Sequence, residues 1–462
     1  MKTFTINLKN IGNQSSLRLD FGYRYFFDYK KGIIFDEYKK DTIKLKYVLN
    51  LLQSQKVKKG ELEQPEKLID LGNIERRFNN LIDVEEVEEI GSDKNILQDG
   101  DLVIPKMQPQ MGNIFLNLNH ERFIGSTELL EYEVNDNFRP TFLYYLITSK
   151  RFLNDLAKLE SGKTHRRVNP DDLLKIKIPL IPKPTQDQIV SKIEPIEKQI
   201  KEFKSQIKDP QEIINQVFAR EFGFDLEKFE ESKKEKFFEV NFSKLSNYHT
   251  LRFDVKHQKY FDIFNEIISK FPSSFALKKI SKDGGKYGAN ESAKDGEKGF
   301  DIRYIRITDI DNIGNLTDEG WKTAENIDEQ YLLQDNDFLF ARSGNTVGKT
   351  FLYDSKKHEE AIFAGYFIKF NLDFTNLDKT FFLYYTKSFI YDFWVKGIVR
   401  IKGQPNINAN EYLELKIPNI PLQDQQKIVN EIKKELDKQQ NFKKQIKEKR
   451  NEIDEIIERI IR

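Results

Sequence analysis

The stretches IKIPLIPKPTQDQIVSKI (Ile176–Ile193) and LKIPNIPLQDQQKIVNEI (Leu415–Ile432) align without a gap at an offset of 239 residues (415 − 176). Upstream, QDGDLVI from Gln98 matches QDNDFLF at an offset of 236 (334 − 98), and LRLD from Leu17 matches LRFD at an offset of 234 (251 − 17). Because the offset drifts by only a few residues over the whole half, two copies of one unit make up nearly the whole chain.

Each copy is expected to be a compact α+β domain. The period far exceeds the about 20–50 residues of solenoid repeats, so duplicated globular domains are predicted. Segments such as GFDIRYIRITDID and DNDFLFARSG alternate and are rich in β-branched and aromatic residues, which indicates short strands. One helix is predicted after them in each copy, over residues 141–159 and 380–396, where apolar residues recur at three- and four-residue spacing.

The strongest periodic pattern follows each Ile-Pro-containing stretch. Apolar residues recur in alternating steps of four and three, as in a heptad seam, through Ile189, Ile193, Ile196, Ile200, Phe203, Ile207, Pro210, Ile214 and Val217. The second copy repeats the pattern, with two polar interruptions, through Ile428, Ile432, Leu436, Gln439, Phe442, Ile446, Lys449, Ile453, Ile456 and Ile460. Two long helices are therefore expected, over 183–223 and 420–462. Pro195 and Pro210 are expected to bend or shorten the first.

Composition excludes several classes of chemistry. The 462 residues include no Cys and five His, which excludes disulfides, Cys-ligated zinc and thiol nucleophiles and leaves little for another metal site. No cofactor is expected. No run of about 18 apolar residues and no signal-peptide pattern occurs, so we expect a cytoplasmic protein without membrane contact. With 75 basic and 74 acidic residues the net charge is +1, so any nucleic-acid binding must rest on local patches.

Two variable α+β modules, each ending in an Ile-Pro-x-Ile-Pro element and a long helix, resemble the specificity subunit of type I restriction–modification enzymes. The residues that carry the resemblance are Ile178, Pro179, Pro182, Gln186 and Gln188 in copy one, and Ile417, Pro418, Pro421, Gln423, Gln425 and Gln426 in copy two. The preceding turns and loops add Asp99, Asp101 and Asn169, and Asp335, Asp337 and Asn408. The resemblance covers the chain nearly end to end.

The resemblance implies two tandem target-recognition domains, 1–182 and 224–419, separated by two long helices that form an antiparallel coiled coil. In this family each domain recognises one half of a split, asymmetric DNA target, and the helices set the spacing. Methyltransferase subunits, two of them here, dock on the assembly, and restriction and motor subunits are added for cleavage. About 35–40 helical residues at about 1.5 Å each would span about 50–60 Å, or about one and a half turns of B-DNA. The alternative is that each helix packs on its own domain.

Side chains suited to DNA lie at matching positions of the two copies. Guanine is recognised by Arg or Lys, adenine by Asn or Gln, and phosphates by Lys, Arg and hydroxyl groups. One loop carries Lys163, His165, Arg166 and Arg167 in copy one, and Arg400, Lys402, Gln404 and Asn406 in copy two. A second follows the Asp-x-Asp turns and carries Lys106, Gln108 and Gln110, and Arg342, Ser343, Asn345 and Lys349. The glycine-rich stretch GGKYGAN permits close approach to a phosphate and adds Lys286, Tyr287 and Asn290. For each residue the alternative is a solvated turn.

Enzymatic alternatives lack their motifs. SGNTVGKT, at 343–350, is rejected as a nucleotide-binding loop because Ser343 stands where the pattern needs Gly. No Asn-Pro-Pro or Asp-Pro-Pro element of a DNA adenine methyltransferase occurs, and no predicted sheet gathers a nuclease's carboxylates beside a Lys. A non-catalytic protein is therefore expected. Two alternatives stay open: a duplicated-domain protein-interaction scaffold, and the recognition subunit of a methylation-only or phage-exclusion system.

Overall fold

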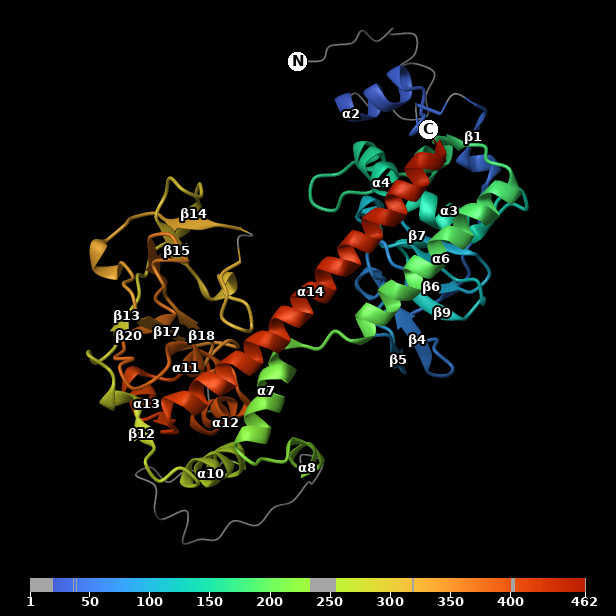
Figure 1. The fold of residues 1–462 in the computed structure, drawn as a ribbon. Helices are drawn as coiled ribbons and strands as arrows, with labels where there is room; N and C mark the ends of the chain where they lie inside the picture. The colour runs from blue at the N-terminus through green and yellow to red at the C-terminus, as the bar shows by residue number, and fades with distance from the viewer. Residues whose placement is uncertain are drawn as a thin grey trace. The chain divides into compact units, whose positions relative to one another are not determined.

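The chain divides into two compact units, each of which contains one copy of the repeat (Figure 1). A computed structural model describes residues 20–35, 37–38, 40–232, 255–317, 320–399 and 404–461. Unit 1 comprises Met1–Ser205 and Phe442–Arg462, and unit 2 comprises Gln206–Asn441. Each unit therefore includes part of the long helix that follows copy one and part of the long helix that follows copy two. Of the matching Leu-Arg-x-Asp stretches, residues 17–19 and 251–254 lie outside the described residues.

Unit 1 is built on short strands in two sheets. The larger sheet has the order β3-β6-β9-β4-β5, with β3 Lys56–Val57, β4 Glu66–Ile69, β5 Glu85–Val87, β6 Lys94–Leu97 and β9 Phe123–Ser126. The other has the order β2-β10-β7-β8, with β2 Leu49–Leu51, β7 Leu102–Pro105, β8 Phe115–Leu116 and β10 Leu129–Val134. Every residue of β7 is buried, which places that strand in the core. Beside the sheets, β1 (Thr42–Lys44) pairs antiparallel with β11 (Lys177–Pro179), the strand of the first Ile-Pro element.

Unit 2 repeats this plan. Its main sheet has the order β13-β20-β17-β18, with β13 Lys286–Tyr287, β17 Asp337–Ala341, β18 Thr350–Leu352 and β20 Phe367–Asn371. Three further strand pairs are formed by β12 (Phe275–Ala276) with β21 (Lys416–Ile417), β14 (Ala293–Asp295) with β16 (Lys322–Ala324), and β15 (Arg303–Ile305) with β19 (Ala361–Phe363). In both units a parallel pair joins equivalent strands, with Leu68 opposite Ile124 in unit 1 and Tyr304 opposite Ile362 in unit 2. The predicted α+β class with two tandem domains is confirmed.

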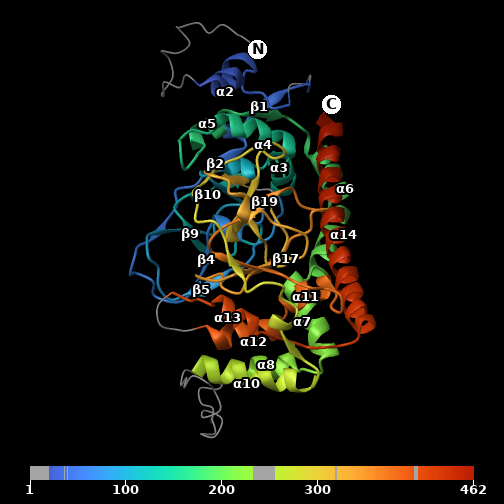
Figure 2. The same ribbon diagram turned by 90° about the vertical axis from the view of Figure 1, so that its left-hand side faces the viewer.

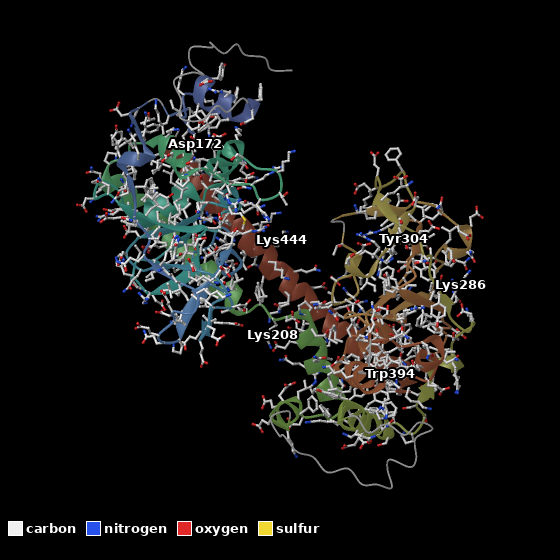
Figure 3. All side chains as sticks on the ribbon, turned by 180° about the vertical axis from the view of Figure 1, so that it is seen from behind. Asp172, Lys208, Lys286, Tyr304, Trp394 and Lys444 are labelled. Atoms are coloured by element: carbon white, nitrogen blue, oxygen red, sulfur yellow. The ribbon has the colours of Figure 1, made fainter. Side chains whose placement is uncertain are left out.

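The core of unit 2 is rich in aromatic side chains, and those of the helices pack against the main sheet. Trp394, labelled in Figure 3, is 2% exposed and packs near Tyr412, whose hydroxyl donates to the Ala341 carbonyl at 2.7 Å. Tyr412 belongs to α13 (Ala409–Leu413), and α8 covers Leu226–Ser232. α10 (Val255–Ser269) packs along α12 (Phe389–Ile398), as Figure 2 shows. Burial of such large rings stabilises the packing of the helices on the sheet.

The two long helices pair antiparallel, as predicted. The first is divided into α6 (Lys183–Ser205) and α7 (Pro210–Glu221), and the second is one helix, α14 (Leu422–Ile461). In unit 1 the rings of Phe203 and Phe442 stack with centroids 6.0 Å apart, and Glu197 lies 3.6 Å from Arg450. In unit 2, Lys427 and Glu221 pair at 3.4 Å, and Arg220 pairs with Glu431. From pair to pair, a higher residue number on the first helix goes with a lower residue number on the second, which is the order of an antiparallel pair. The seam isoleucines Ile193, Ile200, Ile432 and Ile453 are at most 1% exposed.

The prolines and one polar interruption of the seam have identifiable places. α6 continues through Pro195, whereas Pro210 is the first residue of α7, where a missing N–H costs nothing. Asp209 caps α7 by accepting from the Gln211 N–H at 2.7 Å. Gln439 is 4% exposed, and its side-chain oxygen accepts from the Lys208 N–H at 2.9 Å, beside the break between the helices. Gln439 thus satisfies a backbone donor that the break leaves without a helical partner.

The single helix expected in each copy is two helices that meet at a corner, so that prediction was wrong. In unit 1, α3 (Pro140–Ile147) ends at Thr148, and α4 (Lys150–Leu156) is capped by Ser149, which accepts from the Phe152 N–H. In unit 2, α11 (Lys379–Tyr385) ends at Thr386, and α12 follows with Ser388 at its cap position. The apolar spacing runs through both corners, whereas the hydroxyl side chains compete with the helix for backbone groups. α5 covers Pro170–Lys175 and α2 covers Phe21–Arg24.

Both helix corners receive two polar side chains from the second half of a long helix. In unit 1, Arg450 Nη2 donates to the Thr148 carbonyl at 3.1 Å, and Asp454 accepts from the Lys150 N–H at 3.1 Å. In unit 2, the side chain of Gln211 donates to the Lys387 carbonyl, and Asn215 accepts from the Phe389 N–H at 2.8 Å. Each residue of one corner stands 239 positions from its counterpart. The repeat therefore extends to the manner in which the helices dock.

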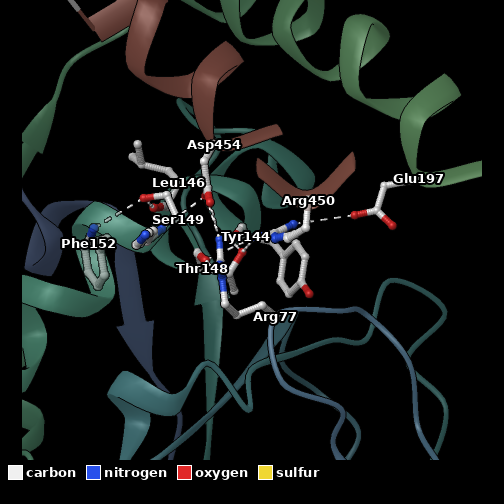
Figure 4. A network of polar contacts seen from close by, with 10 residues as sticks. Arg77, Tyr144, Leu146, Thr148, Ser149, Phe152, Glu197, Arg450 and Asp454 are labelled. Atoms are coloured by element: carbon white, nitrogen blue, oxygen red, sulfur yellow. Dashed lines mark hydrogen bonds and ion pairs between the residues drawn. The ribbon is translucent and has the colours of Figure 1, made fainter. Parts of the chain in front are cut away.

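The corner of unit 1 also contains a charged network (Figure 4). Arg77 Nη2 contacts both oxygens of Asp454, at 2.7 and 2.6 Å, and Arg77 Nε donates to the Thr148 carbonyl at 3.0 Å. Burial lowers the pKa of the Arg450 guanidinium and raises that of the Glu197 carboxyl. Both shifts oppose an ion pair, because desolvation outweighs the attraction between groups 3.6 Å apart. The hydrogen bonds of Arg77, Asp454 and Arg450 therefore hold this end of α14 in place.

Candidate nucleic-acid interface

In unit 1 the two loops that sequence analysis singled out lie side by side. Residues 106–110 follow β7, and residues 163–168 precede α5. The Gln108 N–H donates to the Arg166 carbonyl at 3.1 Å, and the Val168 N–H donates to the Lys106 carbonyl at 2.9 Å. We call residues 106–110 and 163–168 loop pair 1. The structure thus brings together the predicted DNA-binding residues of copy one, which are Lys106, Gln108, Gln110, Lys163, His165, Arg166 and Arg167.

Loop pair 2, residues 342–345 with 404–407 of unit 2, has the same backbone register. The Gly344 N–H donates to the Pro405 carbonyl at 3.0 Å, and the Ile407 N–H donates to the Arg342 carbonyl at 2.8 Å. These bonds match those of loop pair 1 at offsets of 236 in the first loop and 239 in the second. Isolated antiparallel bridges, Met107 with Arg167 and Ser343 with Asn406, stand at the same offsets. The two loop pairs are one backbone arrangement that carries different side chains.

The cations of loop pair 1 are not equally available to a ligand. Arg167 is held by Glu128, with Nε and Nη2 at 3.0 and 3.1 Å from the two carboxylate oxygens. This guanidinium lowers the pKa of Glu128. Arg166 is 64% exposed and lies 3.9 Å from Glu160, whose pKa is raised by burial. Lys163 and His165 are exposed. Loop pair 1 therefore presents Lys163, His165 and Arg166 outward and fixes Arg167 in place.

Loop pair 2 presents an arginine supported by an aromatic ring. The Arg342 guanidinium lies 4.8 Å from the centroid of the Tyr287 ring, so the glycine-rich stretch does reach this surface. The Arg342 N–H donates to the carbonyl of Tyr366, a residue with 60% exposure. The same hydrogen bond in unit 1 joins Lys106 to Glu128. Sequence reasoning missed Glu128 and Tyr366, because neither belongs to a recognisable motif and their equivalence depends on the backbone bond.

The other predicted residues of copy two lie within loop pair 2, near it, or outside the described residues. Gln404 and Asn406 are exposed within it, whereas Arg400 and Lys402 lie outside the described residues. Asn290 is exposed and follows Ala289, which forms an isolated bridge with Ala364 after the strand that contains Tyr287. Lys286, labelled in Figure 3, donates to the Gln330 carbonyl at 2.7 Å. Lys349 donates to the Ile307 carbonyl at 3.3 Å, and burial lowers its pKa.

Lys349 and Asn345 line a pocket of about 530 Å³ in unit 2, at the α11–α12 corner. Lys387 also lines it; its ammonium donates to the Thr350 carbonyl at 2.7 Å, and burial lowers its pKa to about 7. The pocket adjoins loop pair 2 through Asn345. The buried ammonium of Lys387 thus bonds the backbone of β18, which pairs with β17.

A family model described as the type I restriction modification DNA specificity domain matches the chain twice, over residues 36–210 and 275–452. The chain belongs to this family. Its two copies are type I restriction–modification DNA specificity domains, and both loop pairs lie inside the matched ranges. The duplication found from the sequence is thus a duplication of specificity domains.

Three solved structures are similar to this specificity protein along most of its length. One is a chain of a structure described as the structural basis of complex assembly and conformational transition of the type I R-M system; it is 15% identical, with 91% of this chain and 96% of that chain covered and a TM-score of 0.46. The HsdS subunit of Thermoanaerobacter tengcongensis is 15% identical, with 91% and 95% covered and a TM-score of 0.33. The type I restriction–modification S subunit of M. genitalium is 14% identical, with 90% and 95% covered and a TM-score of 0.40. The comparison with curated proteins finds no match.

The described part of this specificity protein has neither a metal-binding cluster nor a membrane-spanning helix. No group of three or more His, Asp or Glu side chains there is placed to hold a metal ion. No described helix is both long enough and apolar enough to cross a membrane. The described loop pairs carry groups suited to a polar ligand: exposed cations in loop pair 1, and exposed amides with an arginine beside the Tyr287 ring in loop pair 2.

Proposed function

We propose that this chain recognises a split, asymmetric DNA target for a type I restriction–modification complex, with one loop pair on each half of the target. The observation that carries the proposal is the shared backbone register of the loop pairs together with their different side chains. Loop pair 1 offers Lys163, His165 and Arg166, and loop pair 2 offers Arg342, Gln404 and Asn406. These residue types recognise guanine, adenine and phosphate. One backbone scaffold therefore presents two different sets of side chains, one for each half-site of the DNA.

The chain supplies recognition and no catalysis. Two methyltransferase subunits dock on it and provide methyl transfer, and restriction and motor subunits join for cleavage. Residues 1–182 and 224–419 act as the recognition domains. The helical segments 183–223 and 420–462 set the distance between the half-sites. The complex acts in the cytoplasm, where it has access to chromosomal and invading DNA.

The dependence of DNA affinity on salt tests the role of the loops. Each phosphate contact contributes about 0.9 to the slope of log K against log salt. Neutralising Lys163 and Arg166 together by Ser is expected to lower that slope by up to about two and to weaken binding at low salt. The matched control neutralises Lys433 and Lys434, two exposed lysines of α14, and is expected to change the slope little. Absence of DNA binding by the unmodified chain at low salt would contradict the proposal and favour a protein-interaction scaffold.

Methylation mapping tests the complete function. Cells that hold the chain and its methyltransferase partner are compared with cells from which the chain is deleted. We expect one split methylated motif to disappear on deletion. A motif that persists would show that specificity comes from another protein. A motif that disappears while unmethylated phage DNA is never restricted would identify a methylation-only system.

A further inference from the structure

Gln108 has a backbone conformation that suits glycine. Its φ and ψ are 48° and 44°, in the left-handed region, and Pro109 follows it. A side chain disfavours this region, and a following proline disfavours helical conformations further. The equivalent residue of copy two is Gly344, with a φ of 80° and the same backbone hydrogen bond across its loop pair. The fold thus accommodates glycine at this point, and copy one nevertheless has glutamine.

The side chain of Gln108 has no evident structural task. It does not cap the short 3-10 turn of Pro109–Met111 that follows. No hydrogen bond of its carboxamide occurs within the described part of the chain, and the residue is half-buried rather than enclosed. The nearby Gln110 differs, because its side chain hydrogen-bonds Glu160. Within the described residues, Gln108 therefore keeps an amide donor and a carbonyl acceptor unused, in the loop pair that also carries the exposed cations Lys163 and Arg166.

We infer that Gln108 is a specificity-determining residue whose carboxamide recognises the adenine of an A·T pair in the half-site bound by loop pair 1. This inference rests on the proposed function. A carboxamide can accept from adenine N6 and donate to adenine N7 at the same time, which no other base offers in that order. One such pair gives about a tenfold to hundredfold preference for the correct base. Gly344 offers no side chain, so the half-site bound by loop pair 2 lacks the equivalent contact.

The test compares the unmodified full-length chain with Gln108→Gly by selection from a library of randomised double-stranded DNA. The unmodified chain is expected to enrich a split motif. With Gln108→Gly, the preference for adenine at one position of one half should fall at least tenfold, while the other half keeps its sequence. Because glycine suits the backbone, the midpoint of thermal unfolding should be unchanged or higher. The control is His120→Gly, an exposed residue of unit 1 that also has a positive φ (49°), which should leave every base preference unchanged.

Each other outcome contradicts one specific statement. If Gln108→Gly retains every base preference of the unmodified chain, Gln108 does not recognise a base. If it loses base preference together with thermal stability, its role is structural, and the inference also fails. If the unmodified chain enriches no split motif, the proposed function fails before the variant is considered.

Discussion

Removal of the Asp454 carboxylate tests whether the charged network fixes α14 on unit 1. Asp454 is 7% exposed, accepts from Arg77 at 2.6 and 2.7 Å, and accepts from the Lys150 N–H at 3.1 Å. Asp454→Ala leaves a guanidinium and a backbone donor without their acceptor. Loss of one partner of a buried ion pair costs about 3–5 kcal/mol. Since the Arg77 side chain keeps 22% exposure, we expect the lower end, about 3 kcal/mol.

The repeat supplies a matched control in unit 2. Asn215 occupies the equivalent position and accepts from the Phe389 N–H at 2.8 Å. Asn215→Ala removes an uncharged hydrogen bond, which costs about 1 kcal/mol. Hydrogen exchange of the full chain measures both, because each corner contributes its own peptides. We expect exchange at the α3–α4 corner to accelerate about a hundredfold in Asp454→Ala, and exchange at the α11–α12 corner about fivefold in Asn215→Ala.

Equal acceleration in the two variants would refute the argument that the buried charge, rather than the position, determines the cost. The double variant Arg77→Ala/Asp454→Ala provides a further check. Without the guanidinium, the missing carboxylate leaves no uncompensated charge, so the double variant should lose less stability than the sum of the single variants. A strictly additive loss would show that the two side chains do not interact.

Three further tests, with four substitutions, concern local features of unit 2. Burial lowers the pKa of Lys387 to about 7, so between pH 7 and 9 the unfolded chain binds a proton that the native chain lacks. The free energy of unfolding should therefore rise with pH by up to about 1.4 kcal/mol per pH unit. Urea unfolding of Lys387→Met should show a flatter slope. Tyr287→Ala removes the ring beneath Arg342 and should weaken binding to one half-site about two- to fivefold, measured by fluorescence anisotropy; unchanged affinity would exclude the stacked arginine from the interface. Gly348 has a φ of 88°, and a methyl group added there would lie only 2.8 Å from an atom of α12, whereas Gly299 has a φ of 84° and open space around it. Calorimetry should show that Gly299→Ala lowers the free energy of unfolding by about 1 kcal/mol and that Gly348→Ala lowers it by at least about 2 kcal/mol.

The sequence predicts the features of this fold that repeat along the chain. Matching stretches at offsets of 236 and 239 identify two equivalent domains, and the heptad seam identifies the antiparallel helix pair, because both depend on local spacing. The corners at Thr148 and Thr386 were not predicted, since apolar spacing continues through them and a capping hydroxyl ends the helix only when its backbone partners are in place. The break after Ser205 is likewise invisible in the seam, although Pro210 marks where α7 begins.

Residue type predicts which side chains could bind DNA, but it does not show which of them are already held by another side chain. Arg166 and Arg167 are adjacent and chemically identical, yet Glu128 holds Arg167 through two hydrogen bonds while Arg166 remains 64% exposed. Glu128 is 39 residues from Arg167 in the chain. Only the tertiary fold brings them together, so no pattern of the sequence separates the fixed arginine from the available one.

Equivalent positions of the two copies show which parts of a loop pair are structural. The offset between copies grows from 236 at Gln108 and Gly344 to 239 at Arg166 and Pro405, so copy two contains three additional residues between its two loops. The hydrogen bond between those positions is nevertheless kept, at 3.1 and 3.0 Å. The added residues must therefore be absorbed elsewhere in the domain, and the fold constrains the backbone of the loops more than the intervening chain. Where side chains differ at such constrained positions, the backbone does not require them. A glutamine where the backbone favours glycine is the clearest case.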